Sequence, residues 1–134
     1  MHLDAAVRAD PVLRRVAIVV GVIFLIACLP KFLAYGWERD AFVRFDLPAP
    51  GFLVIVAGVV ELVGGALLVA GRLVLPSCVV LTVTMLVAFV AGGILAGDEI
   101  PSLTLAPALV VAMAWLVVAA ARRGRPRVPG YRAS

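Results

Sequence analysis

One carboxylate interrupts a long apolar stretch of this sequence. Glu61 is the only charged residue between Gly51 and Gly71, where every other residue is apolar or glycine. An ionisable residue inside a membrane-spanning segment is costly to bury, so it is a functional hypothesis by default. Because burial favours the uncharged form of a carboxyl, Glu61 is a candidate for carrying a proton or binding a ligand. The alternative is a structural role, in which Glu61 hydrogen-bonds between helices.

Lys31 and Thr82 are the other polar candidates for ligand binding. Lys31 follows Pro30 near the end of an earlier apolar run, and Thr82 lies within a later one. With a helical rise of 1.5 Å per residue, Glu61 lies about 15 Å below the outer end of its helix. A direct ion pair with Lys31 would stretch both side chains, so we predict a water-bridged link. The alternative is that Lys31 extends to the lipid headgroups.

The sequence predicts neither a metal site nor a self-sufficient catalytic site. Cys28 and Cys78 are far apart in apolar runs, and His2 is the single histidine. Metal and haem sites need several converging His or Cys ligands. We therefore expect no catalytic residue in this chain. Any redox chemistry would belong to a partner protein or to a bound organic cofactor such as a quinone.

Four apolar stretches are long enough to cross a lipid bilayer. The chain has 134 residues, of which 64% are hydrophobic, whereas soluble domains are about 45–50% apolar. A run of about 18 or more apolar residues is typical of a transmembrane helix. We expect an all-α, multi-pass four-helix bundle formed by one membrane domain, residues 1–121. The predicted spans are residues 16–33, 51–70, 73–95 and 103–121.

The basic residues predict the orientation in the membrane. Arg72, Arg122 and Arg123 lie on the side of the two termini, where most of the Lys and Arg residues gather. Loops rich in Lys and Arg face the cytoplasm, so we expect both termini on the cytoplasmic side of the plasma membrane. Residues 122–134 are predicted to be a disordered basic tail beside anionic headgroups. Nucleic acid is not an expected partner, because aromatic side chains are not interleaved with this charge.

Small residues predict which helix faces point inward. Ala57, Glu61 and Gly65 are spaced by four residues and share one helix face, with Gly64 beside them. Because small residues let membrane helices pack closely, this stripe turns Glu61 into the bundle. The corresponding inward faces are predicted to hold Ala17, Gly21, Cys28 and Lys31 on the first span, Cys78, Thr82, Met85, Phe89 and Gly92 on the third, and Ala108, Ala112, Trp115 and Ala119 on the fourth.

Local signals mark several helix ends between the spans. Asp10 and Pro11 can start a helix, since aspartate caps helices and proline suits the first helical position. Gly71 and Arg72 predict a tight turn, and Ser102 a cap for the fourth span. Residues 39–45 are expected to form a short helix at the membrane surface.

Three sequence features together resemble the DoxX family of small four-helix membrane proteins. They are GVIFLIACLPKFL at residues 21–33, Glu61 followed by a Gly-Gly pair, and a Gly-Arg turn leading into the third span. The resemblance covers about residues 14–121. Cys28 stands where the family usually has glycine. The residues that match the family pattern are Pro30, Lys31, Glu61, Gly64, Gly65 and Arg72.

The resemblance implies a role in membrane redox complexes. The family is named for a subunit associated with quinol oxidation and thiosulfate:quinone oxidoreductase complexes. We therefore expect an accessory or quinone-interacting, non-catalytic subunit that associates with membrane or peripheral redox proteins or with itself. A proton-coupled small-molecule transporter and a structural assembly factor are the alternatives. We expect Glu61→Gln to keep the fold and to lose activity that depends on a ligand or partner.

Overall fold

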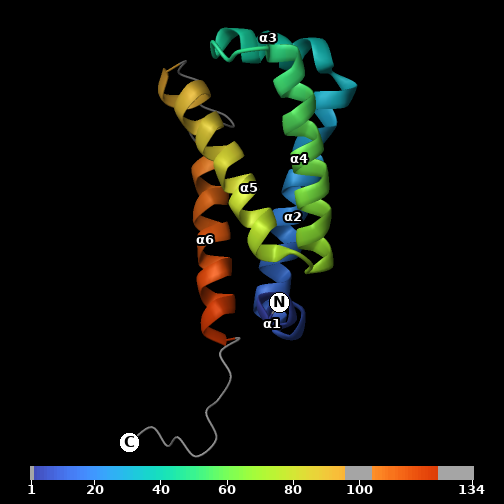
Figure 1. Cartoon of the computed structure of the whole chain (residues 1–134), viewed down its shortest axis with the longest axis vertical. Helices are drawn as coiled ribbons and strands as arrows, with labels where there is room; N and C mark the ends of the chain where they lie inside the picture. The colour runs from blue at the N-terminus through green and yellow to red at the C-terminus, as the bar shows by residue number, and fades with distance from the viewer. Residues whose placement is uncertain (1, 96–103, 124–134) are drawn as a thin grey trace, which may run out of the picture.

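The computed structural model describes residues 2–95 and 104–123, and this part of the chain is almost entirely helical (Figure 1). Four segments are long and apolar enough to cross a membrane, namely 11–33, 50–70, 74–94 and 105–123. The expectation of an all-α membrane protein with four spanning helices is therefore confirmed. The helices are α1 (His2–Ala9), α2 (Pro11–Leu33), α3 (Tyr35–Arg44), α4 (Pro50–Ala70), α5 (Val74–Val87), the π-helix η1 (Ala88–Leu95) and α6 (Leu105–Arg123).

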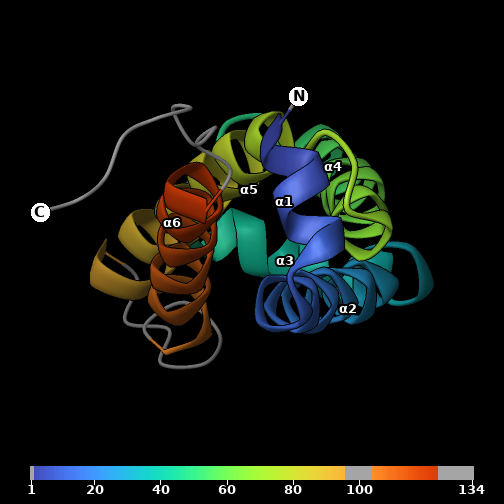
Figure 2. The same cartoon turned by 90° about the horizontal axis from the view of Figure 1, so that it is seen from below.

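The bundle is closed at one end and splayed at the other. α2 and α4 lie side by side along their length and form the most extensive helix contact of the described chain. From the α4–α5 turn, α5 runs obliquely away from α4 toward α6 (Figure 1). α1 crosses beneath the closed end, as the view from below shows (Figure 2), and α3 lies across the splayed end.

α2 and α4 approach so closely that their backbones touch. A Cβ atom on Gly21 would lie 2.6 Å from the carbonyl oxygen of Gly65, and one on Gly65 would lie 2.8 Å from that of Gly21. The neighbouring Gly64 faces another helix, where a Cβ would meet the side chain of Leu81 at 2.9 Å. Small residues permit this packing of membrane helices. The Gly-Gly pair thus places α4 against α2 with one glycine and against α5 with the other.

We expect Gly65→Ala to destabilise the protein by about 1–3 kcal/mol, the usual cost of overpacking. The new Cβ would meet the carbonyl oxygen of Gly21, which is a backbone atom and cannot rotate away. Gly36→Ala is the control, since a Cβ at this position in α3 meets nothing within 4 Å. Alanine is favoured over glycine in helices by about 0.8–1 kcal/mol, so the control should be neutral or stabilising. Thermal unfolding in detergent measures both; equal melting temperatures for the two variants would contradict the close approach.

The short helix α1 binds both ends of the α4–α5 turn, a feature that the sequence analysis did not predict. The Asp4 carboxylate accepts hydrogen bonds from the backbone N–H groups of Leu73 (3.0 Å) and Val74 (2.9 Å), at the start of α5. Arg8 donates to the carbonyl oxygen of Gly71 (2.9 Å), at the end of α4. Helix starts favour anionic partners and helix ends favour cationic ones. α1 therefore satisfies both helix termini that meet at this turn.

Removing the Asp4 carboxylate should loosen this end of the bundle. Asp4 is 8% exposed, and no side chain of the helix itself caps the start of α5. We expect Asp4→Ala to lower the stability by about 1–3 kcal/mol, because it leaves backbone donors without a partner. Asp40→Ala, which removes an exposed carboxylate from α3, is the matched control. Hydrogen exchange at the first turn of α5 should accelerate only in the Asp4 variant, and unchanged exchange would refute the contact.

Asp10 starts α2, as its sequence position predicts. Its carboxylate accepts hydrogen bonds from the backbone N–H groups of Val12 (2.9 Å) and Leu13 (3.2 Å). It also pairs with Arg123 at 2.6 Å, which joins the start of α2 to the end of α6. The hydrogen bond from Leu13, together with the Arg123 guanidinium, holds the pKa of Asp10 below its ordinary value. Both side chains are partly exposed, so the pair contributes little stability.

The predicted inward face of the fourth span is wrong. Ala108 and Trp115 are exposed, and Ala112 and Ala119 are only partly buried. The larger side chains on the adjacent face fill the interior instead, because α6 packs against the oblique α5 with its bulky residues. The buried residues of α6 are Ala106, Leu109, Met113, Leu116 and Ala120.

The other elements differ from the expectation mainly in their limits. α3 begins at Tyr35, ahead of the expected residues 39–45. The third span is not one regular α-helix, since it changes to the π-helix η1 at Ala88. Gly71 adopts a left-handed conformation and ends α4, which confirms the predicted turn. The expected disordered tail begins too early, because Arg122 and Arg123 belong to the last turn of α6. Residues 124–134 of that tail and the expected cap at Ser102 lie outside the described residues.

Candidate functional site

Lys31 and Glu61 meet where α2 and α4 pack together. Lys31 lies in the last turn of α2, and Glu61 lies in the middle of α4. The small-residue stripe turns Glu61 inward as predicted, and only 2% of the residue is exposed. The Lys31 side chain is 12% exposed. A carboxyl group and an amine are thus enclosed together within the membrane-spanning part of the bundle.

The two side chains form a direct ion pair, so the predicted water bridge is wrong. Lys31 Nζ lies 3.2 Å from Glu61 Oε2. The relative height of α2 and α4 explains why a direct contact is possible. Phe32 and the Cβ of Lys31 pack against Gly58, where an added Cβ would be 2.9 Å from Phe32 and 3.2 Å from Lys31. Lys31 is therefore level with a residue only about 4.5 Å along the helix from Glu61, within easy reach of its carboxylate.

The carboxylate of Glu61 retains unused hydrogen-bonding capacity. Its Oε2 atom is buried and has no hydrogen bond of good geometry with any described residue, although it lies within ion-pair distance of Lys31. Lys31 Nζ also donates to the carbonyl oxygen of Ala27, at 3.4 Å. Buried polar atoms are usually hydrogen-bonded, so an unsatisfied one requires an explanation. A ligand that donates to this oxygen would supply the missing partner.

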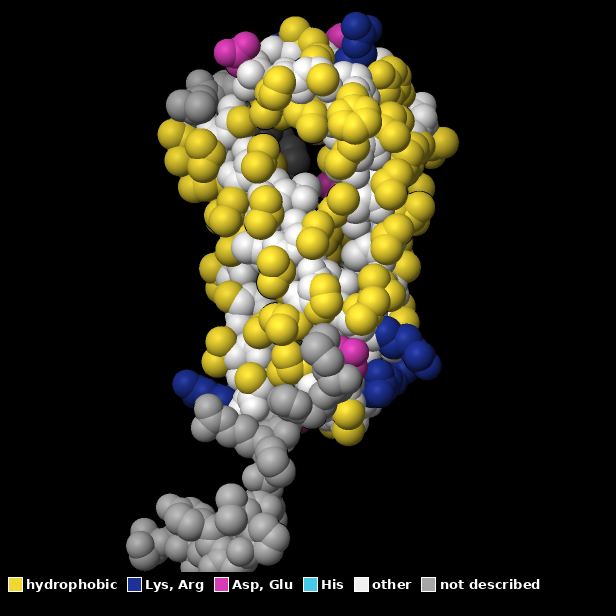
Figure 3. Space-filling view, viewed as in Figure 1, with side chains coloured by type: hydrophobic (Ala, Val, Ile, Leu, Met, Phe, Trp, Pro, Cys, Tyr) yellow, Lys and Arg dark blue, Asp and Glu magenta, His cyan; other side chains and the backbone are white. Residues whose placement is uncertain are grey.

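The surface of the molecule is hollowed beneath α3, between α4 and α5 (Figure 3). An acidic side chain is visible at the edge of this hollow, and hydrophobic side chains surround it. Glu61 is the only acidic residue in the four spanning segments. The hollow opens beside α4, the helix that carries Glu61. Ligand sites are concave and mostly apolar, with a few polar groups that orient the ligand.

The remaining candidate residues do not join the ion pair. Thr82 is partly buried on α5, and no hydrogen bond or ion pair links it to Lys31 or Glu61 among the described residues. Arg72 and Arg122 are exposed at the opposite, closed end of the bundle. The candidate site therefore consists of the two charged side chains, with an apolar hollow that opens beside α4.

One further polar group, which was not predicted from the sequence, is buried in the bundle. Ser77 in α5 is 6% exposed, and its hydroxyl has no hydrogen-bond partner among the described residues. It lines a second groove of about 320 Å³ between α4 and α5, along with Val60, Gly64 and Leu81. A lone serine after a proline carries no sequence signal for burial.

We expect the Lys31–Glu61 pair to show strong energetic coupling. Lys31→Met leaves a buried carboxylate without its partner, and Glu61→Gln leaves the amine unpaired, so each should cost about 3 kcal/mol or more. The double variant should be less destabilised than either single variant, which corresponds to a coupling of about 3 kcal/mol or more in a double-mutant cycle. The exposed Asp10–Arg123 pair is the control and should couple by less than about 1 kcal/mol. Additive effects at Lys31 and Glu61 would exclude the ion pair.

The family model for DoxX matches residues 12–93, which include α2, α3, α4 and most of the third span. The chain belongs to the DoxX family. The expected resemblance is thus confirmed, and both Lys31 and Glu61 lie within the matched residues, whereas α6 lies beyond them. No curated protein and no solved structure matches the chain.

Proposed function

We propose that this DoxX protein is an accessory, quinone-interacting subunit of a redox complex in the plasma membrane. The observation that carries the proposal is the buried Lys31–Glu61 pair, in which one carboxylate oxygen lacks a hydrogen bond. The pair lies in a membrane-spanning bundle that is hollowed beneath α3 (Figure 3). A ligand that suits it is mainly apolar, dissolves in the membrane and carries a few hydrogen-bonding groups.

A quinone has this chemistry. Its ring and side chain are apolar, and its two carbonyl oxygens accept hydrogen bonds. Lys31 can donate to a carbonyl oxygen, and Glu61 can accept a hydrogen bond from the hydroxyl group of the quinol form. The residues present therefore fit both forms of the ligand. When bound, the quinone supplies the capacity to take up two electrons and two protons.

The chain's own part in the proposal is to bind the ligand and to handle protons. Glu61 can hold a proton beside the hollow, while Lys31 fixes the position of the carboxyl group. The electrons would come from a partner redox protein, which makes this chain an accessory subunit. A proton-coupled carrier would use the same carboxyl, and proton-gradient-dependent uptake into vesicles would identify it.

The proposed orientation places the α1 end in the cytoplasm. Arg8, Arg14 and Arg15 lie at this end, together with Arg72 and the end of α6. The α3 end holds Lys31, Arg39 and Arg44. The excess of basic residues at the α1 end supports this orientation, and the hollow then opens near the outer face of the membrane.

A quinone titration tests the proposal. The fluorescence of Trp37 in α3, recorded in a Trp115→Phe background, should fall saturably when a short-chain quinone is added. In the same titration with the quinol form, Glu61→Gln should weaken binding by about ten-fold or more, because the quinol hydroxyl loses a hydrogen bond to a buried charged group, which contributes about 1.5–3 kcal/mol. Asp40→Asn should bind as the wild type does.

Two outcomes would contradict the proposal. One is quenching that does not saturate, since this indicates collisions with Trp37 rather than binding. The other is equal quinone affinity in the wild type and in the double variant Lys31→Met/Glu61→Gln. Because the double variant keeps the helices packed without charges, equal affinity would show that the pair is structural.

A further inference from the structure

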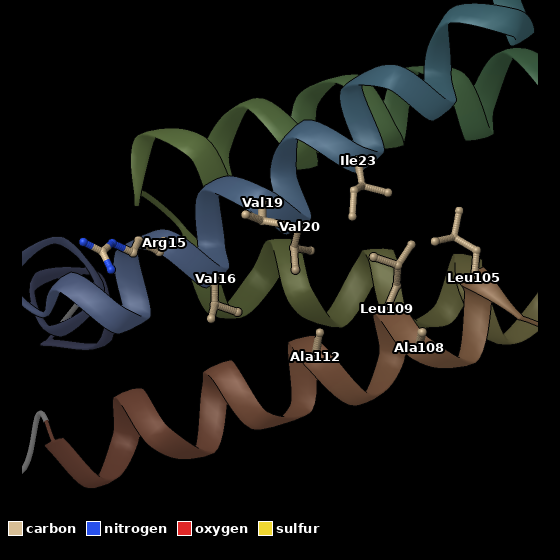
Figure 4. A pocket seen from close by; sticks show the side chains of 9 residues that line it. All are labelled: Arg15, Val16, Val19, Val20, Ile23, Leu105, Ala108, Leu109 and Ala112. Carbon is tan, nitrogen blue, oxygen red and sulfur yellow. The ribbon is translucent and has the colours of Figure 1, made fainter.

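Another apolar groove, distinct from the one beside Ser77, lies between α2 and α6 (Figure 4). Its volume is about 350 Å³, at the lower end of the range for small-molecule sites. α2 contributes Val16, Val20 and Ile23, and α6 contributes Ala108 and Ala112. Arg15 lies at one end of this otherwise apolar groove (Figure 4).

The groove exists because α2 and α6 do not pack tightly there. α2 turns its glycine face toward α4, where Gly21 touches Gly65. α6 faces α2 with Ala108 and Ala112, whose small side chains leave the space open. Val19 at the rim is 57% exposed. In a membrane, this open side faces the lipid acyl chains.

Arg15 gives one end of the groove a positive charge. It lies one turn into α2, about 6 Å from the start of the helix, and so close to the membrane surface. It makes no ion pair with any residue that the structure describes, whereas Arg123 nearby is paired with Asp10. An unpaired guanidinium at this depth is suited to a phosphate group, which it can bind with two parallel hydrogen bonds.

We propose that this groove binds an anionic phospholipid from the leaflet on the α1 side of the membrane. Arg15 holds the headgroup phosphate, and one acyl chain lies along the groove toward Ile23, about 12 Å away along α2. The apolar walls and the single charge at the membrane surface match the two parts of such a lipid. A second copy of this chain fits less well, because a helix is about 10–12 Å wide with its side chains and would cover the charge of Arg15.

Lipid binding by purified protein tests the charge. In native mass spectrometry with added phosphatidylglycerol or phosphatidylcholine, we expect tighter binding of phosphatidylglycerol. Arg15→Gln should reduce this affinity about five-fold, the effect of one basic residue at an anionic membrane surface. Arg14→Gln is the matched control, because Arg14 is an exposed neighbour that does not line the groove. Equal affinity for the two lipids, or equal losses in the two variants, would overturn the proposal.

Filling the groove tests the position of the acyl chain. Ala108→Phe adds a ring at the groove wall and should reduce the binding of both lipids, whereas Ala114→Phe changes an exposed α6 residue outside the groove and should not. Retention of normal binding by the Ala108 variant would place the lipid elsewhere. If delipidated wild type were a dimer and only Ala108→Phe were monomeric, the groove would be an interface between copies, and the proposal would fail.

Discussion

The contact between the backbones of Gly21 and Gly65 sets the geometry of the whole bundle. It brings the backbones of α2 and α4 into contact and fixes their relative height. The Lys31–Glu61 pair depends on that height, because a shift of one helical turn would separate the two charges. The hollow beneath α3 also depends on the Gly21–Gly65 contact. Because α4 stays against α2, the oblique α5 diverges from both helices (Figure 1). Close packing on one side thus creates open space on the other.

The spanning helices were predictable from the sequence because the bilayer imposes strict requirements. Backbone polar groups in hydrocarbon must pair within the segment, so each long apolar run had to become a helix. The inward direction of Glu61 was predictable for a similar reason, since an ionisable side chain avoids lipid. Both features depend on one segment at a time. They require no knowledge of how the helices are placed relative to one another.

Features that depend on two segments were not predictable. The direct Lys31–Glu61 contact requires the height of α2 against α4, which the packing of Phe32 on Gly58 determines. The face of α6 was misjudged because small residues were taken as a sign of close packing, whereas Ala108 and Ala112 line a groove. α1 is too short to be stable alone and forms against the α4–α5 turn. Its partners are about seventy residues away along the chain.

That separation has a consequence for biosynthesis. Asp4 leaves the ribosome before the four spans, whereas Leu73 and Val74, which donate to it, emerge only after two complete spans have been made. α1 must therefore wait at the membrane surface while α2 and α4 insert as a hairpin. Its docking onto the turn closes the ends of two helices in one step. A segment that is made before the four spans thus reaches its final place only after two of them are complete.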